Sequence, residues 1–258
     1  MSKQSLGFTL LAALSLAGTA QASDWKWSVT PYVWATDVGA DVSIDDRQVA
    51  DMEIDFEDLA DDLEIAAQGH VEGLRGRHGV MLDAFYIHLA DDAQRFALPA
   101  PLAGEALAGG DLTLTILDLG GVFNPRGDGE GFSVLYGGRM VDRDIELDAR
   151  FPVAPGVTLS RSYAVSETLY DALVSARYVG RITPRWTYAV QGNASTGGTE
   201  LTWDALAGLG YSFGDSGCYT LIAGYRYMDI EFEKDADLGQ IDAQVTLSGF
   251  FSGLKISF

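Results

Sequence analysis

The sequence has few basic residues, one cysteine and, beyond its N-terminus, no long apolar run. Its 258 residues include 17 Lys and Arg against 37 Asp and Glu, a formal net charge of -20. Recognition of nucleic-acid phosphates needs clustered basic side chains, so this balance excludes a nucleic-acid partner. The single cysteine, Cys218, excludes an internal disulfide framework and any metal site built on several cysteines.

An apolar stretch near the N-terminus, Leu6 to Ala17, is too short to span a bilayer as a helix, which needs about 20 residues. Lys3 precedes it and Ala20-Gln21-Ala22 follows it. This arrangement is typical of a secretory signal with an A-x-A cleavage site. We therefore expect residues 1–22 to be removed and residues 23–258 to form the exported protein.

Glycines and aromatic residues recur through the exported part in a period-2 pattern. Residues 65–71 and 170–178 alternate in this way, and in residues 201–213 seven alternate positions are all apolar or aromatic: Leu201, Trp203, Ala205, Ala207, Leu209, Tyr211 and Phe213. Such alternation is typical of a transmembrane β-barrel strand with one face in lipid and the other in a polar interior. A soluble β-sandwich alternates as well.

Three features favour the barrel over the sandwich. Predicted turns near 76–79, 124–131, 180–184 and 214–217 are short, whereas the connections near 37–63, 91–110 and 147–162 are long. The chain stops at an alternating strand ending in Phe258, which resembles the signal by which barrel proteins are recognised for outer-membrane insertion. Aromatic residues gather where strands would leave the membrane: Trp25, Trp27, Phe123, Phe132, Tyr178, Trp186, Tyr188, Tyr211, Phe213, Tyr219 and Phe258.

These turns predict an all-β, closed antiparallel transmembrane barrel of ten strands, with eight or twelve as alternatives. An even number would place both termini in the periplasm. The expected strands are 25–36, 64–75, 80–90, 111–123, 132–146, 163–179, 185–195, 199–213, 218–233 and 243–258. In the last of these, the apolar parity changes between Leu247 and Phe250, so we expect a bulge near Gly249.

Trp27, Pro31, Tyr32 and Trp34 form W-x-x-x-P-Y-x-W, followed by Gly39. With the terminal Phe, this motif resembles small Gram-negative outer-membrane β-barrel proteins of the OmpA/opacity type. The resemblance covers essentially the whole exported chain and implies a location in the outer membrane. It also implies contact with membrane lipid and lipopolysaccharide, and recognition by the barrel-assembly machinery through Leu254, Ile256 and Phe258. Because the chain ends at the last strand, we expect no peptidoglycan-binding domain.

If the aromatic face meets lipid, the lumen receives a balanced set of charges. Planar guanidinium groups can bridge carboxylates across such a lumen. We therefore expect a structural or surface-interaction protein with a lumen largely closed by salt bridges, and a narrow pore for ions or small solutes as the alternative. The expected lumen residues are Glu72, Asp83, Asp118, Arg139, Arg143, Asp171, Arg177, Asp204, Arg226 and Lys255.

The strongest charge feature lies between Asp37 and Glu64, where 28 residues carry twelve acids and one Arg47. We expect an external hairpin there, followed by a short helix near 56–63. Repulsion among carboxylates favours divalent cations, but the spacing of an EF-hand is lacking. We therefore expect diffuse cation accumulation at this acidic loop and no resident metal site.

A lipid- or peptide-hydrolysing enzyme of the outer membrane is the second alternative. Such chemistry needs a His base near the external rim or lipid face. Of the three histidines, His78 falls in a turn and His70 faces the lumen near Glu72, so His88 with Asp91 or Asp92 is the best catalytic candidate. No G-x-S-x-G, H-E-x-x-H or phosphate-binding loop supports it. We expect no enzymatic activity and no cofactor.

Overall fold

The computed structural model describes residues 24–44, 47–54, 63–97, 105–154, 157–214, 218–236 and 239–258. The predicted signal peptide and almost all of the predicted helix near 56–63 lie outside these residues. The described part contains the following strands: β1 (Lys26–Ile44), β2 (Arg47–Ile54), β3 (Leu63–Arg75), β4 (His78–Ala97), β5 (Glu105–Phe123), β6 (Gly131–Ala154), β7 (Val157–Arg181), β8 (Trp186–Gly197), β9 (Leu201–Phe213), β10 (Tyr219–Ala236) and β11 (Gly239–Ser257).

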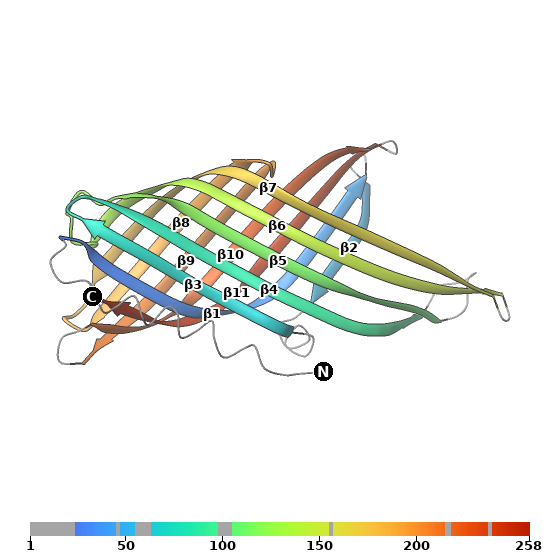
Figure 1. Ribbon diagram of the computed structural model, residues 1–258, viewed down its shortest axis with the longest axis horizontal. Coiled ribbons are helices and arrows are strands. Elements are labelled where there is room, and N and C mark those ends of the chain that lie inside the picture. Colours follow the sequence, from blue (N-terminus) through green and yellow to red (C-terminus); the bar gives the residue numbers. More distant parts are fainter. Residues whose placement is uncertain are drawn as a thin grey trace.

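Ten of these strands form a closed antiparallel barrel (Figure 1). Each strand from β3 to β11 pairs with the next, and β1 closes the sheet by pairing with both β3 and β11. β2 pairs only with the Val38–Ile44 part of β1 and forms an additional hairpin. The predicted count of ten is therefore confirmed, and the acidic segment adds no pair of strands to the barrel wall.

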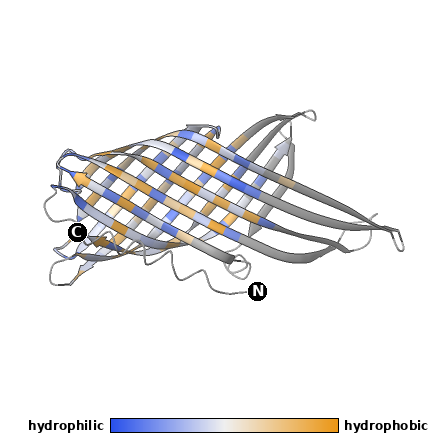
Figure 2. Ribbon diagram, viewed as in Figure 1, coloured by the Kyte–Doolittle hydropathy of each residue, from blue (hydrophilic) through white to orange (hydrophobic). Residues whose placement is uncertain are grey.

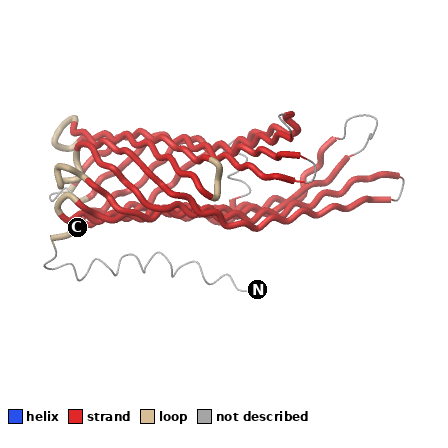
Figure 3. Tube along the Cα trace, turned by 90° about the horizontal axis from the view of Figure 1, so that it is seen from above, coloured by secondary structure: helices blue, strands red, loops and turns tan. Residues whose placement is uncertain are grey.

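The two ends of the barrel differ. We call the end with the short turns, Asp24 and Phe258 the turn end, and the opposite end the far end (Figure 3). The backbones of Trp27 and Phe258 exchange two hydrogen bonds of 2.9 Å at the turn end. The β3–β4 hairpin turns there through Gly76, whose φ of 60° lies in the left-handed region that glycine adopts without strain.

The connections near 91–110 and 147–162 are not long loops, as the sequence predicted, but mainly continued strand. β6 and β7 stay paired out to Ala154 and Val157, and β4 and β5 stay paired out to Ala97 and Glu105. Continued pairing satisfies the backbone donors and acceptors of both strands, which a loop would leave to water. These hairpins therefore project at the far end, while the β8–β9 hairpin ends early at Gly197 and Leu201 (Figure 1).

The barrel carries its apolar side chains on the outside. The predicted alternation in 201–213 is confirmed, since Leu201, Trp203, Leu209 and Phe213 are exposed while Thr202 and Asp204 are buried. Other exposed outer residues include Val33, Leu119, Tyr136, Tyr170, Val174, Val190, Leu221 and Phe250. Figure 2 shows the resulting alternation of hydropathy along the strands. An apolar exterior of this extent requires a lipid environment rather than water.

No described residue belongs to a helix that is long and apolar enough to cross a membrane.

Aromatic residues pair on the outer face toward the turn end. Ring centroids lie 5.0 Å apart for Trp186 and Tyr211, and 5.8 Å apart for Phe213 and Tyr219. The predicted aromatic girdle at this end is thereby formed by neighbouring strands, as expected at a membrane interface.

The interior toward the far end is apolar, which the sequence analysis did not anticipate. Seven buried side chains pack together there, and we call them the apolar plug: Trp34, Phe85, Ile87, Ile116, Met228, Ile230 and Leu247. Leu247 reaches the plug because the predicted bulge near Gly249 does not form. β11 keeps one unbroken register with β10 and with β1 across Gly249. The parity change in its sequence thus reflects an interior that changes from polar to apolar.

Candidate functional site

A buried ion-pair network crosses the middle of the lumen. Arg139 on β6 donates to both carboxylate oxygens of Asp118 at 2.7 Å and to Asp204 on β9 at 3.1 Å. Arg226 also donates to Asp204, and Asn193 donates to the same carboxylate at 2.6 Å. The side chains of Arg139 and Asp204 are wholly inaccessible to solvent. The network is therefore a buried layer of ion pairs, which we call the charge layer.

The charge layer contacts the apolar plug directly. The Arg226 guanidinium lies 4.9 Å from the centroid of the Trp34 ring, and Trp34 donates a hydrogen bond of 3.2 Å to the carbonyl of Gly249. Trp34 in turn packs against Phe85 with ring centroids 5.6 Å apart. A cation held against an aromatic face and removed from water is stabilised by that face. Two different barriers are therefore stacked along the lumen.

A second cluster lies closer to the turn end. Arg177 donates to the two carboxylate oxygens of Glu72 at 2.6 and 2.9 Å. His70 lies between two carboxylates, with its Nε2 3.5 Å from Glu72 and its Nδ1 3.1 Å from Asp83. Tyr32 donates to Asp83 at 3.0 Å. His70 thus faces the lumen near Glu72, as the sequence predicted.

Two of the predicted lumen charges have partners outside these clusters. Asp171 makes no arginine pair among the described residues. It accepts hydrogen bonds at the β8–β9 turn from the amides of Gly198 and Thr199 and from the hydroxyls of Thr199 and Ser195. Arg143 pairs with Glu167 at 2.6 Å, with its guanidinium 4.2 Å from the ring centroid of Phe232. Asp171 thus stabilises the β8–β9 turn, and Arg143 links the neighbouring strands β6 and β7. Neither side chain belongs to the charge layer.

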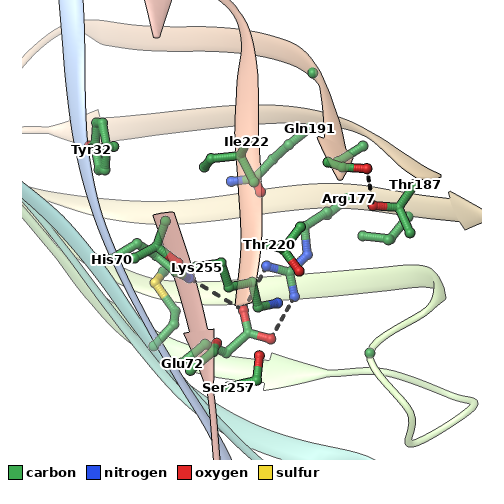
Figure 4. A pocket seen from close by; sticks show the side chains of 18 of the residues that line it. Tyr32, His70, Glu72, Arg177, Thr187, Gln191, Thr220, Ile222, Lys255 and Ser257 are labelled. Atoms are coloured by element: carbon green, nitrogen blue, oxygen red, sulfur yellow. Dashed lines mark hydrogen bonds and ion pairs between the residues drawn. The ribbon is translucent and has the colours of Figure 1, made fainter. Parts of the chain in front are cut away.

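Beneath the charge layer, the lumen contains a cavity of about 660 Å³, which we call the vestibule. Its lining runs from Lys26, Asp128 and Phe258 at the turn end to Asp118 and Arg226 at mid-barrel, so it opens at the turn end. In Figure 4, Lys255 lies beside the Arg177–Glu72 pair, with His70, Thr220 and Ser257 around them. The vestibule falls within the range of about 300–1,000 Å³ that is typical of small-molecule pockets.

One part of the vestibule wall is apolar. Leu74, Met81 and Leu135 line it and belong to a buried cluster with Val122 and Leu173. Across the lumen, Phe251 packs over two glycines, since a Cβ at Gly208 or Gly224 would lie 3.0 or 2.6 Å from its ring. The cavity thus combines charged groups with apolar surface.

The carboxylates at the vestibule mouth are already engaged. Arg126 pairs with Asp128 at 3.1 Å, and Arg181 pairs with Glu130. The backbone amide of Glu130 and the Arg126 guanidinium hold the pKa of Asp128 below its usual range. Asp128 therefore stays ionised and paired at neutral pH.

His88 lies on the outer face of β4, where its Nδ1 is 2.9 Å from the hydroxyl of Thr113. The side chains of Asp91 and Asp92 lie outside the described residues, so the proposed catalytic pairing has no geometry to test. The acidic side chains of the acidic loop also lie outside the described part, apart from those of Asp37 and Asp41. No group of three or more His, Cys, Asp and Glu side chains in the described ranges could hold a metal ion.

Sequence reasoning missed the apolar plug and Glu167. The signal for the plug is parity: Leu112, Leu114 and Ile116 alternate in phase with Asp118, and Met228 and Ile230 with Arg226. If the charged residue faces the lumen, its apolar neighbours in phase must face it too.

No protein-family model matches the chain, and no curated protein sequence matches it. Among solved structures, the translocator domain of the autotransporter NalP from Neisseria meningitidis is similar at 11% identity and a TM-score of 0.44, covering 96% of this chain and 94% of that one. Ail of Yersinia pestis has 11% identity and a TM-score of 0.28, with 88% and 97% covered. OprG of Pseudomonas aeruginosa has 11% identity and a TM-score of 0.29, with 90% and 95% covered.

Similarity at this level says nothing about what the chain binds or does. The fold follows from the chain's own geometry. Its closed ten-stranded sheet, apolar exterior and charged interior are those of an integral outer-membrane β-barrel protein, the architecture that the sequence resemblance indicated.

Proposed function

We propose that the protein is a non-conducting barrel of the Gram-negative outer membrane that acts through the hairpins it holds outside the cell. The observation that carries the proposal is the double closure of the lumen by the charge layer and the apolar plug. Arg139 has no solvent-exposed side-chain surface, and Leu247 and Met228 are each 1% exposed. An ion would have to displace both barriers to pass.

In this proposal the turn end is periplasmic and the far end extracellular. Short periplasmic turns and longer external connections are the usual asymmetry of such barrels. The far-end hairpins then lie among lipopolysaccharide, and the acidic loop adds negative charge to that layer. Leu254, Ile256 and Phe258 serve as the signal for the assembly machinery at the end of β11.

A narrow pore is the second candidate function, and the vestibule is the observation that favours it. The vestibule gives water a path from the turn end to mid-barrel. Conduction would then need the Arg139 pairs and the plug to rearrange together. We propose no catalytic step for either function.

The orientation can be tested with single cysteines in a Cys218→Ser background. Thr158→Cys lies on the projecting part of β7, and Arg77→Cys lies in the β3–β4 turn. We expect a membrane-impermeant maleimide to label Thr158→Cys on intact cells, and Arg77→Cys only after the outer membrane is permeabilised. The opposite pattern, or recovery of the protein as a soluble periplasmic species, would contradict the proposal.

A further inference from the structure

Two lysines line the vestibule without an ion pair among the described residues: Lys26 near its mouth and Lys255 deeper in the barrel. Every side-chain carboxylate that lines it has a partner: Glu72 with Arg177, Asp83 with His70 and Tyr32, Asp118 with Arg139, Asp128 with Arg126, and Glu130 with Arg181. Among the lining cations, Arg177 and Arg226 are paired as well. Lys255 forms no ion pair or hydrogen bond with any residue that the structure describes.

Lys255 is well inside the barrel rather than at its rim. It follows Leu254 on β11, pairs in register with Thr220 of β10, and shares the inward parity of Leu247 and Phe251. Its side chain is exposed to the vestibule and lies beside the Arg177–Glu72 pair (Figure 4). The nearby carboxylate of Glu72 is already held by Arg177. An ammonium group that faces a semi-enclosed cavity without an ion pair of its own attracts an anion from the solvent.

A second polar group points to the same conclusion. Ser175 on β7 lines the vestibule, is 4% exposed, and has a buried hydroxyl with no hydrogen-bond partner. Buried hydroxyls normally form a hydrogen bond, and a buried hydroxyl without one costs free energy of folding. The Nε of Arg177, two residues along β7, is also buried without a partner. A bound polar group could satisfy donors of this kind.

The remaining wall limits the chemical class of the ligand. Leu74, Met81 and Leu135 present apolar surface, as do Ile222, Leu206 and Phe251 across the lumen. A small inorganic anion would leave this surface in contact with water, whereas a hydrocarbon chain would cover it. The closed charge layer above prevents passage, so a ligand must enter and leave at the turn end.

We propose that the vestibule binds a small amphipathic carboxylate, with its carboxylate against Lys255 and its hydrocarbon body along the wall formed by Leu74, Met81 and Leu135. This site is separate from the far-end hairpins and does not depend on their role. Entry from the turn end alone rests on the proposed closure of the lumen, and the compartment that supplies the ligand, the periplasm, rests on the proposed orientation.

The test is calorimetric titration of the folded protein in lipid nanodiscs with octanoate, with the heats of empty nanodiscs subtracted. We expect saturable binding at one site per barrel. Acetate has the carboxylate without the chain, and octyltrimethylammonium has the chain with the opposite charge, so both should bind at least tenfold more weakly.

Variants locate the site. Lys255→Met should weaken octanoate binding by about tenfold or more, because a charge-assisted contact is lost. Lys255→Arg should keep most of it. Lys234→Met is the matched control, since it removes the same charge from the far end of β10 and should leave binding unchanged. Ser175→Ala should weaken binding by roughly threefold. A shift in gel mobility on heating verifies that each variant is folded.

Absence of saturable binding above empty nanodiscs would overturn the proposal. Equal affinity of Lys255→Met and the parent would overturn it too, because octanoate would then be partitioning into lipid or lying elsewhere. If acetate bound as tightly as octanoate, the hydrocarbon chain would contribute nothing to binding and the proposal of an amphipathic ligand would be wrong. None of these outcomes depends on which membrane face the turn end occupies, so they are distinguishable from failure of the proposed orientation.

Discussion

Asp204 joins three side chains from three other strands. Arg139 comes from β6, Asn193 from β8 and Arg226 from β10, all within hydrogen-bond distance of its carboxylate. A carboxylate and a guanidinium that are both withdrawn from water each carry a large desolvation cost, which their mutual attraction offsets only while the pair is intact. The charge layer is consequently sensitive to the loss of any one member.

Arg139→Met tests this sensitivity. It leaves Asp118 and Asp204 buried with fewer counter-charges, so we expect a loss of about 3–5 kcal/mol in the free energy of unfolding. The matched control is Arg181→Met, which breaks an ion pair whose Arg side chain is 53% exposed, and it should cost less than about 1 kcal/mol. Urea titration of the folded protein in lipid vesicles, followed by tryptophan fluorescence, measures both. Equal effects would show that the charge layer is not the tight network described above.

His88 is the residue on which the enzyme alternative depends. Its contact with Thr113 on the outer face gives it a structural partner, and we expect no hydrolysis of phospholipid, lipid A or peptide by the parent protein. Assays of the folded protein with these three substrates check the expectation. Turnover that disappears in His88→Ala, with heat-dependent gel mobility unchanged, would establish an enzyme.

At the scale of the element, β11 shows how far the sequence alone could lead. The alternation of apolar and polar residues with period 2 predicts that this strand exists and that it runs to the end of the chain. It also places Lys255 in the lumen. The apolar pair Val245 and Leu247 suggested a bulge because the whole interior was assumed to be polar. The observed register is continuous, so alternation alone gives the correct face for each residue of β11. The interior changes from polar to apolar along this strand.

The cross-lumen partners could not be predicted in the same way. Parity correctly placed Glu72 and Arg177 inside, but they are 105 residues apart in the chain and lie on β3 and β7, which are not neighbours in the sheet. Which side chains meet across a barrel depends on strand stagger and tilt, and these are fixed only when the sheet closes. Arg143 is a different case, because its partner Glu167 lies directly opposite it on the neighbouring strand β7, so this pair depends only on the register of one hairpin.

The β1–β2 hairpin gives the next prediction. Its acids, with those of the following segment, should concentrate Ca²⁺ diffusely. Changing Asp45, Asp46, Asp51 and Asp55 to Asn should therefore lower bound Ca²⁺ and weaken association with lipopolysaccharide in low-salt buffer. Salt screens exposed charges over about 8 Å at physiological strength, so the difference from the parent should vanish as monovalent salt rises. Calorimetry at two salt concentrations measures this. Saturable Ca²⁺ binding that persists at high salt and is lost in the variant would indicate a specific metal site instead.

On the scale of the whole molecule, closure of the sheet depends on its last strand. β11 pairs with β10 along its whole length and with β1, and the backbone of Phe258 bonds to that of Trp27. We expect deletion of Phe258 to reduce the amount of barrel in the outer membrane, measured by fractionation and by the gel shift on heating. The matched control, Phe132→Ala, removes an exposed aromatic from the outer face and should assemble normally. Equal assembly of the deletion and the parent would exclude the terminal residue as an insertion signal.

The interior of the whole barrel has three successive parts: the open vestibule, the buried charge layer and the apolar plug. The first admits water and small molecules, while the second and third oppose ions by different means. Charged groups hold one another across the lumen in the charge layer, and the plug presents no polar group to replace an ion's hydration. In the proposed function, this order makes the barrel accessible from one end only.

Single-channel recording of the refolded protein in planar lipid bilayers tests this closure most directly. The account predicts silence at all moderate voltages, with the heat-dependent gel shift confirming that the inserted barrel is folded. The control is the triple variant Arg139→Ala, Trp34→Ala, Leu247→Ala, which removes side-chain volume from both barriers. In its folded form it should produce conductance steps, which shows that the recording detects inserted protein. Discrete conductance steps from the parent protein would contradict the account and establish a pore.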